Sequence, residues 1–232
     1  MSKENNVKIV SYNQNLQRLG VVDVFRSLIW TRRFYSSGEF ELHAPLNSRN
    51  LALLAENNII SKREYEDKGG QIVRRISKES GIVENIAIDD TVNEITAKGR
   101  FLSSIMDRRA IKTVINFNGT VEAGMRKLVT SVTPLPFLQL GTLQGYTQKA
   151  QFQVSYKELY TYICKLAKYG NTGFVIRADF KAKALFFEVY EGVERSKSQR
   201  ERSRVVFSEI YKNLNGVTYV FNLSLIHISE PT

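Results

Sequence analysis

The sequence predicts an α+β fold, mostly antiparallel β, with a few short helices packed on the sheets. Runs that alternate apolar with polar residues dominate the first half of the chain, and short polar turns such as residues 36–38 and 89–90 separate them. Such turns favour antiparallel pairing. The 232 residues also include 13 Phe and 11 Tyr, which favour strands. The second half adds two segments with helical periodicity.

The clearest β-hairpin signal lies in residues 28–45, where two β-rich runs flank a Ser-Ser-Gly turn. In the return run, Phe40 and Leu42 point to one face. The opposite face carries Glu39, Glu41 and His43. This alternation predicts a half-buried strand.

Further elements follow in order along the chain. Residues 47–56 predict a short helix, and residues 58–60 predict a strand. Residues 81–88 and 92–97 predict two more strands. Residues 98–109 begin with Lys-Gly-Arg and continue as a Leu-containing helix that ends in Asp-Arg-Arg.

This succession resembles a siphophage tail protein family, the Gp37-like group, which is related to tail-hub and baseplate-hub proteins. The resemblance rests on the Trp-Thr-Arg-Arg strand at residues 30–33, the Gly-Glu-Phe-Glu-Leu return strand at residues 38–42, and Pro45. The Lys-Gly-Arg block at residues 98–100 follows in the same order. The likeness covers roughly residues 20–222.

The resemblance implies a tail-hub-like fold and a structural role rather than an enzymatic one. Subunits of such a family assemble into a ring that joins the tail tube to the host-contacting apparatus. The implied partners are copies of this chain in a homo-oligomer ring and other phage tail proteins. The implied location is the virion, in the phage tail, after assembly in the host cytoplasm. One departure is at residues 110–112, where Ala-Ile-Lys replaces the family's usual apolar pair after the double Arg.

We expect four segments along the chain. Residues 1–20 form an N-terminal extension, residues 21–115 a β-rich tail-hub-like domain, and residues 116–223 an α+β second domain with a helix and a β-hairpin. Residues 224–232 look like a translated sequencing adapter, so we expect a non-native read-through tail there. A genuine C-terminal strand is the alternative for this last segment.

The second domain contains the helical periodicity. One apolar stripe comprises Val121, Met125, Leu128 and Val129. A second helix is expected over residues 156–169, where Ser155 and Glu158 can form a capping box and Gly170 can end the helix in a left-handed conformation. Alternating residues within 174–189 predict a hairpin after it.

Composition limits the other function classes. The formal net charge of +10 is compatible with binding to nucleic acid. The basic residues are scattered along the chain, however, so we do not expect nucleic acid as a specific partner. No apolar run is long enough for a membrane span, and the N-terminus lacks the apolar core of a secretory signal. The one cysteine, Cys164, excludes an internal disulfide and is expected to be a buried small hydrophobe.

The sequence carries no recognisable catalytic motif. It has no phosphate-binding loop and no Gly-x-Ser-x-Gly nucleophile elbow, and its two histidines are too few for a histidine-based zinc site or triad. We therefore predict no catalytic, cofactor-binding or metal residues. The strand carboxylates are expected to offset neighbouring cations across the sheet. They are Glu39, Glu41, Glu84 and Glu94.

The candidate residues belong instead to a protein interface, because Trp and Arg are over-represented at interface centres. The candidates are Trp30, Arg32, Arg33, Glu39, Arg108 and Arg109. The alternative is that Trp30 is a core residue and the arginines are solvated. Two other functions also remain open: the attachment region of a tail-associated peptidoglycan-degrading lysin, and a basic nucleic-acid-binding module.

Overall fold

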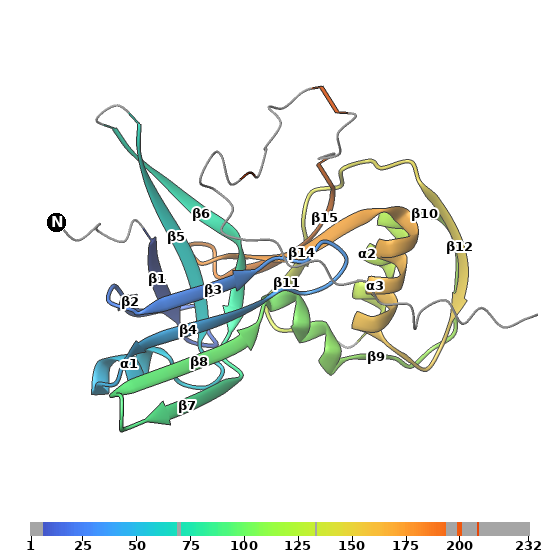
Figure 1. Cartoon of the computed structure of the whole chain (residues 1–232). Helices are drawn as coiled ribbons and strands as arrows, with labels where there is room; N and C mark the ends of the chain where they lie inside the picture. Colours follow the sequence, from blue (N-terminus) through green and yellow to red (C-terminus); the bar gives the residue numbers. More distant parts are fainter. Residues whose placement is uncertain (1–6, 69–70, 133, 194–198, 201–207, 209–232) are drawn as a thin grey trace, which may run out of the picture. The chain divides into compact units, whose positions relative to one another are not determined.

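The computed structural model describes residues 7–68, 71–132, 134–193, 199–200 and 208. Contacts divide the chain into two units, Met1–Gly192 and Val193–Thr232, and the elements below all belong to the first (Figure 1). The expected read-through tail at residues 224–232 lies outside the described residues. The described elements confirm the predicted class, since most of them are antiparallel strands and the helices are short.

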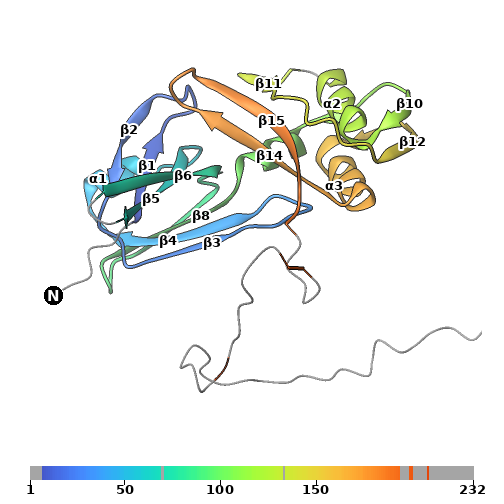
Figure 2. The same cartoon turned by 90° about the horizontal axis from the view of Figure 1, so that it is seen from above.

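Two four-stranded antiparallel sheets form the β-rich part. The first has the order β2-β1-β5-β6 and the second β3-β4-β8-β7. The first consists of β1 (Val7–Tyr12), β2 (Arg18–Val22), β5 (Ile59–Lys68) and β6 (Gln71–Ile82). The second consists of β3 (Ser27–Thr31), β4 (Glu39–Pro45), β7 (Asn85–Asp89) and β8 (Glu94–Arg100). Figures 1 and 2 show β3, β4 and β8 as one layer and β1, β5 and β6 as another.

Smaller sheets and helices complete the unit. The strands are β9 (Ala110–Ile111) with β13 (Lys157–Glu158), β10 (Ile115–Thr120) with β12 (Lys149–Val154), and β11 (Leu138–Leu140) beside the hairpin of β14 (Thr172–Asp179) and β15 (Ala184–Glu191). The helices are α1 (Ser48–Leu53), the 3-10 helix η1 (Leu102–Arg108), α2 (Val121–Ser131) and α3 (Leu159–Gly170). β11 pairs with β15 in parallel, and the other pairs are antiparallel.

The first sheet separates two hydrophobic cores, and its strand β1 is buried on both faces. Ile9 and Ile60 face the core shared with the second sheet, which also contains Phe40 and Leu42. Their neighbours in sequence face the other core, because successive strand residues point to opposite faces. This second core contains Val10 from β1 together with apolar residues of α2, α3 and the β14–β15 hairpin.

The N-terminal part of the chain enters the fold earlier than expected. Residues 7–20 were expected in an N-terminal extension, but they contribute β1 and the beginning of β2 to the first sheet. The larger hydrophobic core contains residues from both sides of the domain boundary that was expected between residues 115 and 116. That domain boundary therefore stays a prediction. The hairpin of β3 and β4 has the predicted facing, with Phe40 and Leu42 buried.

The ends of α3 differ from the prediction. The helix begins at Leu159, and its N-cap Glu158 makes no side-chain capping hydrogen bond, so the capping box with Ser155 is wrong. The physical reason is that Tyr156 is left-handed, with φ 51°, which prevents a helical turn there. At the other end Asn171, not Gly170, takes the left-handed conformation. Gly170 has a packing role, since a Cβ there would lie 2.7 Å from the Val121 side chain of α2.

Candidate assembly surface

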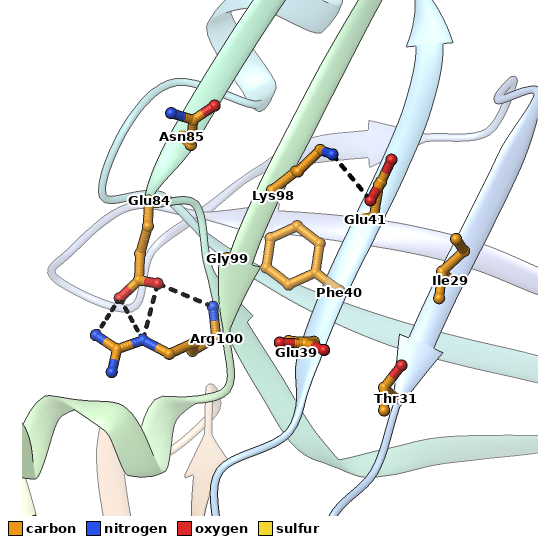
Figure 3. Close-up of a pocket in the computed structure, with 10 residues that line it drawn as sticks. All are labelled: Ile29, Thr31, Glu39, Phe40, Glu41, Glu84, Asn85, Lys98, Gly99 and Arg100. Atoms are coloured by element: carbon orange, nitrogen blue, oxygen red, sulfur yellow. Dashed lines mark hydrogen bonds and ion pairs between the residues drawn. The ribbon is translucent and has the colours of Figure 1, made fainter. Parts of the chain in front are cut away.

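A shallow hollow of about 420 Å³ lies on the solvent side of the second sheet (Figure 3). Its lining comes from β3, β4, β8 and the segment that leads into β7. The residues are Ile29, Thr31, Glu39, Phe40, Glu41, Glu84, Asn85, Lys98, Gly99 and Arg100. β3 is at the end of the strand order, so the hollow extends to a strand edge that no other described strand pairs with. Ile29 lies on this edge strand and is 54% exposed.

Trp30, the first interface candidate, faces inward. It alternates with Ile29 and Thr31 along β3, and its ring centroid lies 4.7 Å from that of Phe101 and 6.0 Å from that of Phe40. Its Nε1 is buried without a hydrogen-bond partner among the described residues. The packing matches the alternative that Trp30 belongs to the core, and an interface role for it stays a prediction.

The next three candidates gather around the β3–β4 connection. Arg33 donates to Glu39 at 2.6 Å, and the two side chains are both largely exposed. This pairing raises the pKa of Arg33 and lowers the pKa of Glu39. Arg32 donates to Glu79 of β6 at 2.7 Å, so it links the loop to the first sheet. Arg32 and Arg33 therefore both form ion pairs within the chain.

The last two candidates lie on a different element. Arg108 ends η1, and Arg109 follows it as the C-cap. The Arg109 guanidinium donates to the backbone oxygens of Arg108 at 2.9 Å and Pro134 at 3.4 Å. The structure thus distributes the six predicted residues over the inner side of β3, its loop and the end of η1, and their joint use as an interface stays a prediction.

A chain of charges across the second sheet was not predicted as a unit. Nδ1 of His43 lies 2.7 Å from Glu94, and Nε2 lies 2.9 Å from Glu41. Lys98 pairs with the second oxygen of Glu41 at 3.0 Å, and Arg26 pairs with Glu94 at 2.8 Å. The contacts of His43 with Glu94 and of Glu41 with Lys98 depend on the pairing of β4 with β8, two strands that are far apart in the sequence.

The charge chain favours the protonated form of the imidazole. Hydrogen bonds to Glu94 and then Glu41 raise the pKa of His43, since each ring nitrogen must carry a proton to donate. Hydrogen bonds from Lys98 and then His43 lower the pKa of Glu41, and the hydrogen bond from His43 lowers the pKa of Glu94. Among the described residues, no group of three or more His, Cys, Asp and Glu is arranged to hold a metal ion.

Arg100 closes the other end of the hollow. Its guanidinium donates to Glu84 at 3.0 Å and also contacts Asp107 of η1, as Figure 3 shows for the first pair. These bonds raise the pKa of Arg100. The face is therefore built of paired charges around an apolar edge residue, an arrangement suited to contact with another polar protein surface.

The family model described as Siphovirus ReqiPepy6 Gp37-like protein matches residues 7–224. The chain belongs to this family. The match confirms the resemblance identified in the sequence, and it includes the β1 segment that the sequence reading assigned to an extension. No curated protein matches the chain. No helix in the described ranges is both long and apolar enough to cross a membrane.

Several solved structures are similar in fold to this Gp37-like chain. Prophage tail protein gp18 from Listeria monocytogenes EGD-e is similar at TM-score 0.50 and 11% identity, over 78% of this chain and 50% of that chain. The tail protein from Neisseria meningitidis MC58 is similar at TM-score 0.47 and 13% identity, over 78% of this chain and 50% of that chain. A chain of a Francisella PdpA-VgrG complex is similar at TM-score 0.46 and 12% identity, over 85% of this chain and 30% of that chain. The chain thus spans half the length of the two tail proteins, and likeness at this identity shows the fold alone.

Proposed function

We propose that this Gp37-like protein is a structural subunit of a siphophage tail tip, a hub or baseplate component that assembles into a ring. The ring would join the tail tube to the host-contacting apparatus. The observation that carries the proposal is the family match over residues 7–224, supported by the fold likeness to a prophage tail protein. On this proposal the protein is a virion component without catalytic activity, and it binds its own copies and other tail proteins.

The open edge at β3 supports assembly as the mode of action. An edge strand presents unpaired backbone groups to which a strand of another chain can add. Ile29 is exposed on this strand, and the ion pair Arg33–Glu39 lies next to it at the β3–β4 connection. An apolar contact with a polar rim is the usual composition of a protein interface.

The described cations also favour a protein partner over nucleic acid. Several form ion pairs with carboxylates of the same chain, which reduces the charge available for phosphates. These cations are Arg26, Arg32, Arg33, Lys62, Lys98, Arg100 and Arg177.

Solution mass measurement tests the proposal. Light scattering after size exclusion should give a discrete oligomer for the full chain, and Ile29→Glu should shift it toward the monomer because a charge enters the contact. Val114→Glu is the matched control, since Val114 is 58% exposed and outside this sheet. A monomer at every concentration, or equal effects of the two substitutions, would count against assembly through this edge. Mass spectrometry of purified phage particles tests the virion location.

A further inference from the structure

A second hollow, of about 380 Å³, lies between the first sheet and the β14–β15 turn. It does not include the residues of the assembly surface. Four of its lining residues are basic, and one is acidic. The lining consists of Tyr12, Ser61, Arg63, Ser77, Lys78, Arg177, Ala178, Asp179, Phe180 and Lys181.

The positive charges of this hollow are only partly neutralised. Arg177 pairs with Glu188 at 2.8 Å. Arg63 donates to the Tyr12 hydroxyl at 2.6 Å, a neutral partner. Among the described residues, neither Lys78 nor Lys181 forms an ion pair, and both lie at the exposed rim. The one acidic residue, Asp179, accepts from the backbone N–H groups of its own turn.

Within the described ranges, two donors in the hollow are buried without hydrogen-bond partners. Ser61 is 0% exposed, and its Oγ makes no hydrogen bond within the described part of the chain. The Nε of Arg63 is also buried without a hydrogen-bond partner among the described residues. A buried donor without an acceptor is costly, and a native structure seldom keeps two together unless something else satisfies them.

A strand irregularity brings these groups to the hollow. The pairing of β5 with β6 passes from Ser61↔Ser80 to Arg63↔Ile76, so residues 77–79 lie opposite Lys62 alone. This bulge places Ser77 and Lys78 at the hollow, while its third residue, Glu79, is paired with Arg32. Bulges of this kind often occur beside functional sites, where they redirect side chains.

We propose that this hollow is a binding site for a carboxylate on an acidic segment of a partner protein. A carboxylate would supply acceptors for the two unpartnered donors, Ser61 Oγ and Arg63 Nε, and the rim lysines suit further acidic residues. A nucleic acid fits less well, because binding of single strands uses open aromatic faces for base stacking. The two rings here, Tyr12 and Phe180, stack on each other at 3.5 Å.

The test measures fluorescence anisotropy of labelled hexaglutamate, hexaglutamine and hexathymidylate with the full chain. Hexaglutamate should bind, and Lys78→Ala with Lys181→Ala should weaken it about fivefold to tenfold. The control pair Lys112→Ala with Lys149→Ala removes the same charge from exposed positions outside the hollow and should change binding less than about twofold. Equal losses in the two pairs, or equal binding of hexaglutamine, would overturn the site.

The buried hydroxyl gives a second and independent measurement. Ser61→Ala should weaken hexaglutamate about tenfold, since a hydrogen bond to a charged acceptor is lost. Its melting temperature without peptide should not fall, because the hydroxyl has no hydrogen-bond partner among the described residues. Unchanged affinity in this variant contradicts the proposal. Tighter, lysine-dependent binding of hexathymidylate would replace the carboxylate assignment with a phosphate one.

Discussion

The phenol oxygen of Tyr160 accepts a hydrogen bond from the backbone N–H of Ser37 at 2.7 Å, across 123 positions of sequence. The bond joins α3 to the connection between β3 and β4. Burial raises the pKa of Tyr160 to about 12, although the Ser37 bond acts in the opposite direction. The Ser37 hydroxyl lies 3.1 Å from the carbonyl oxygens of both Gly38 and Phe101, so the N–H and the hydroxyl of this buried turn residue each have a partner outside the turn.

Tyr160→Phe should reduce the free energy of unfolding by about 1–2 kcal/mol, because it leaves the Ser37 N–H without an acceptor. Urea denaturation measures the loss. Tyr162→Phe is the control on the same helix and should change stability by less than about 0.5 kcal/mol. In a spectrophotometric titration, the tyrosine that ionises near pH 12 should disappear only in the first variant.

His43→Asn should change how stability depends on pH. The pKa of His43 is raised in the folded chain, so the stability it contributes is fully present below its unfolded pKa of about 6.5. That contribution is lost as the pH rises through the higher folded pKa. Glu41 and Glu94 have lowered pKa values and stay ionised over this range. The wild type should therefore exceed the variant most near pH 6 and least near pH 9, and a constant difference would refute the charge chain.

Gly99→Ala should destabilise the chain by at least about 2–3 kcal/mol. An added Cβ would lie 1.8 Å from the backbone oxygen of Ile82, where the chain passes from β6 to β7, and backbone cannot yield cheaply. Gly20→Ala is the comparison, since its Cβ would meet the flexible tip of Leu53 at 2.9 Å. Chemical denaturation should show a loss below about 1 kcal/mol there. Similar losses at both positions would contradict the difference in packing.

Glu122→Gln should loosen the segment before β12. The Glu122 side chain is 1% exposed and accepts from the backbone N–H groups of Gln144, Gly145 and Tyr146, at 2.8, 2.9 and 3.3 Å. An amide has one acceptor oxygen in place of two, so we expect a cost of about 2–3 kcal/mol. Limited proteolysis should cut residues 141–148 faster in this variant, whereas the exposed control Glu56→Gln should behave as the wild type.

The parts of the fold that could be predicted are those with one buried face. β4 and β15 alternate clearly, and α2 carries one apolar stripe, so each was identified from its period. β1 was missed because both of its faces are buried, which removes the alternation. The start of α3 was misplaced because the left-handed Tyr156 interrupts a segment whose composition favours helix.

Only the location of the candidate assembly surface could be predicted from the sequence. The β3–β4 hairpin was singled out by the family's residue order, and the hollow lies on that hairpin. The contacts of Arg32 with Glu79 and of His43 with Glu94 join residues far apart in the chain, so they depend on how the sheets pair and pack. No local pattern in a single sequence carries that information.

The two-sided burial of β1 means that hydrophobicity specifies the register of this strand only weakly. Ile9 faces one core and Val10 the other, so a shift by one residue would still place an apolar side chain in each core. Hydrophobicity alone therefore distinguishes the two alignments poorly. The distinction comes from Ser11, whose hydroxyl donates to the Leu53 carbonyl at 2.5 Å, and from Tyr12, whose ring stacks on Phe180. One hydroxyl and one aromatic ring thus select the correct alignment of the strand that both cores share.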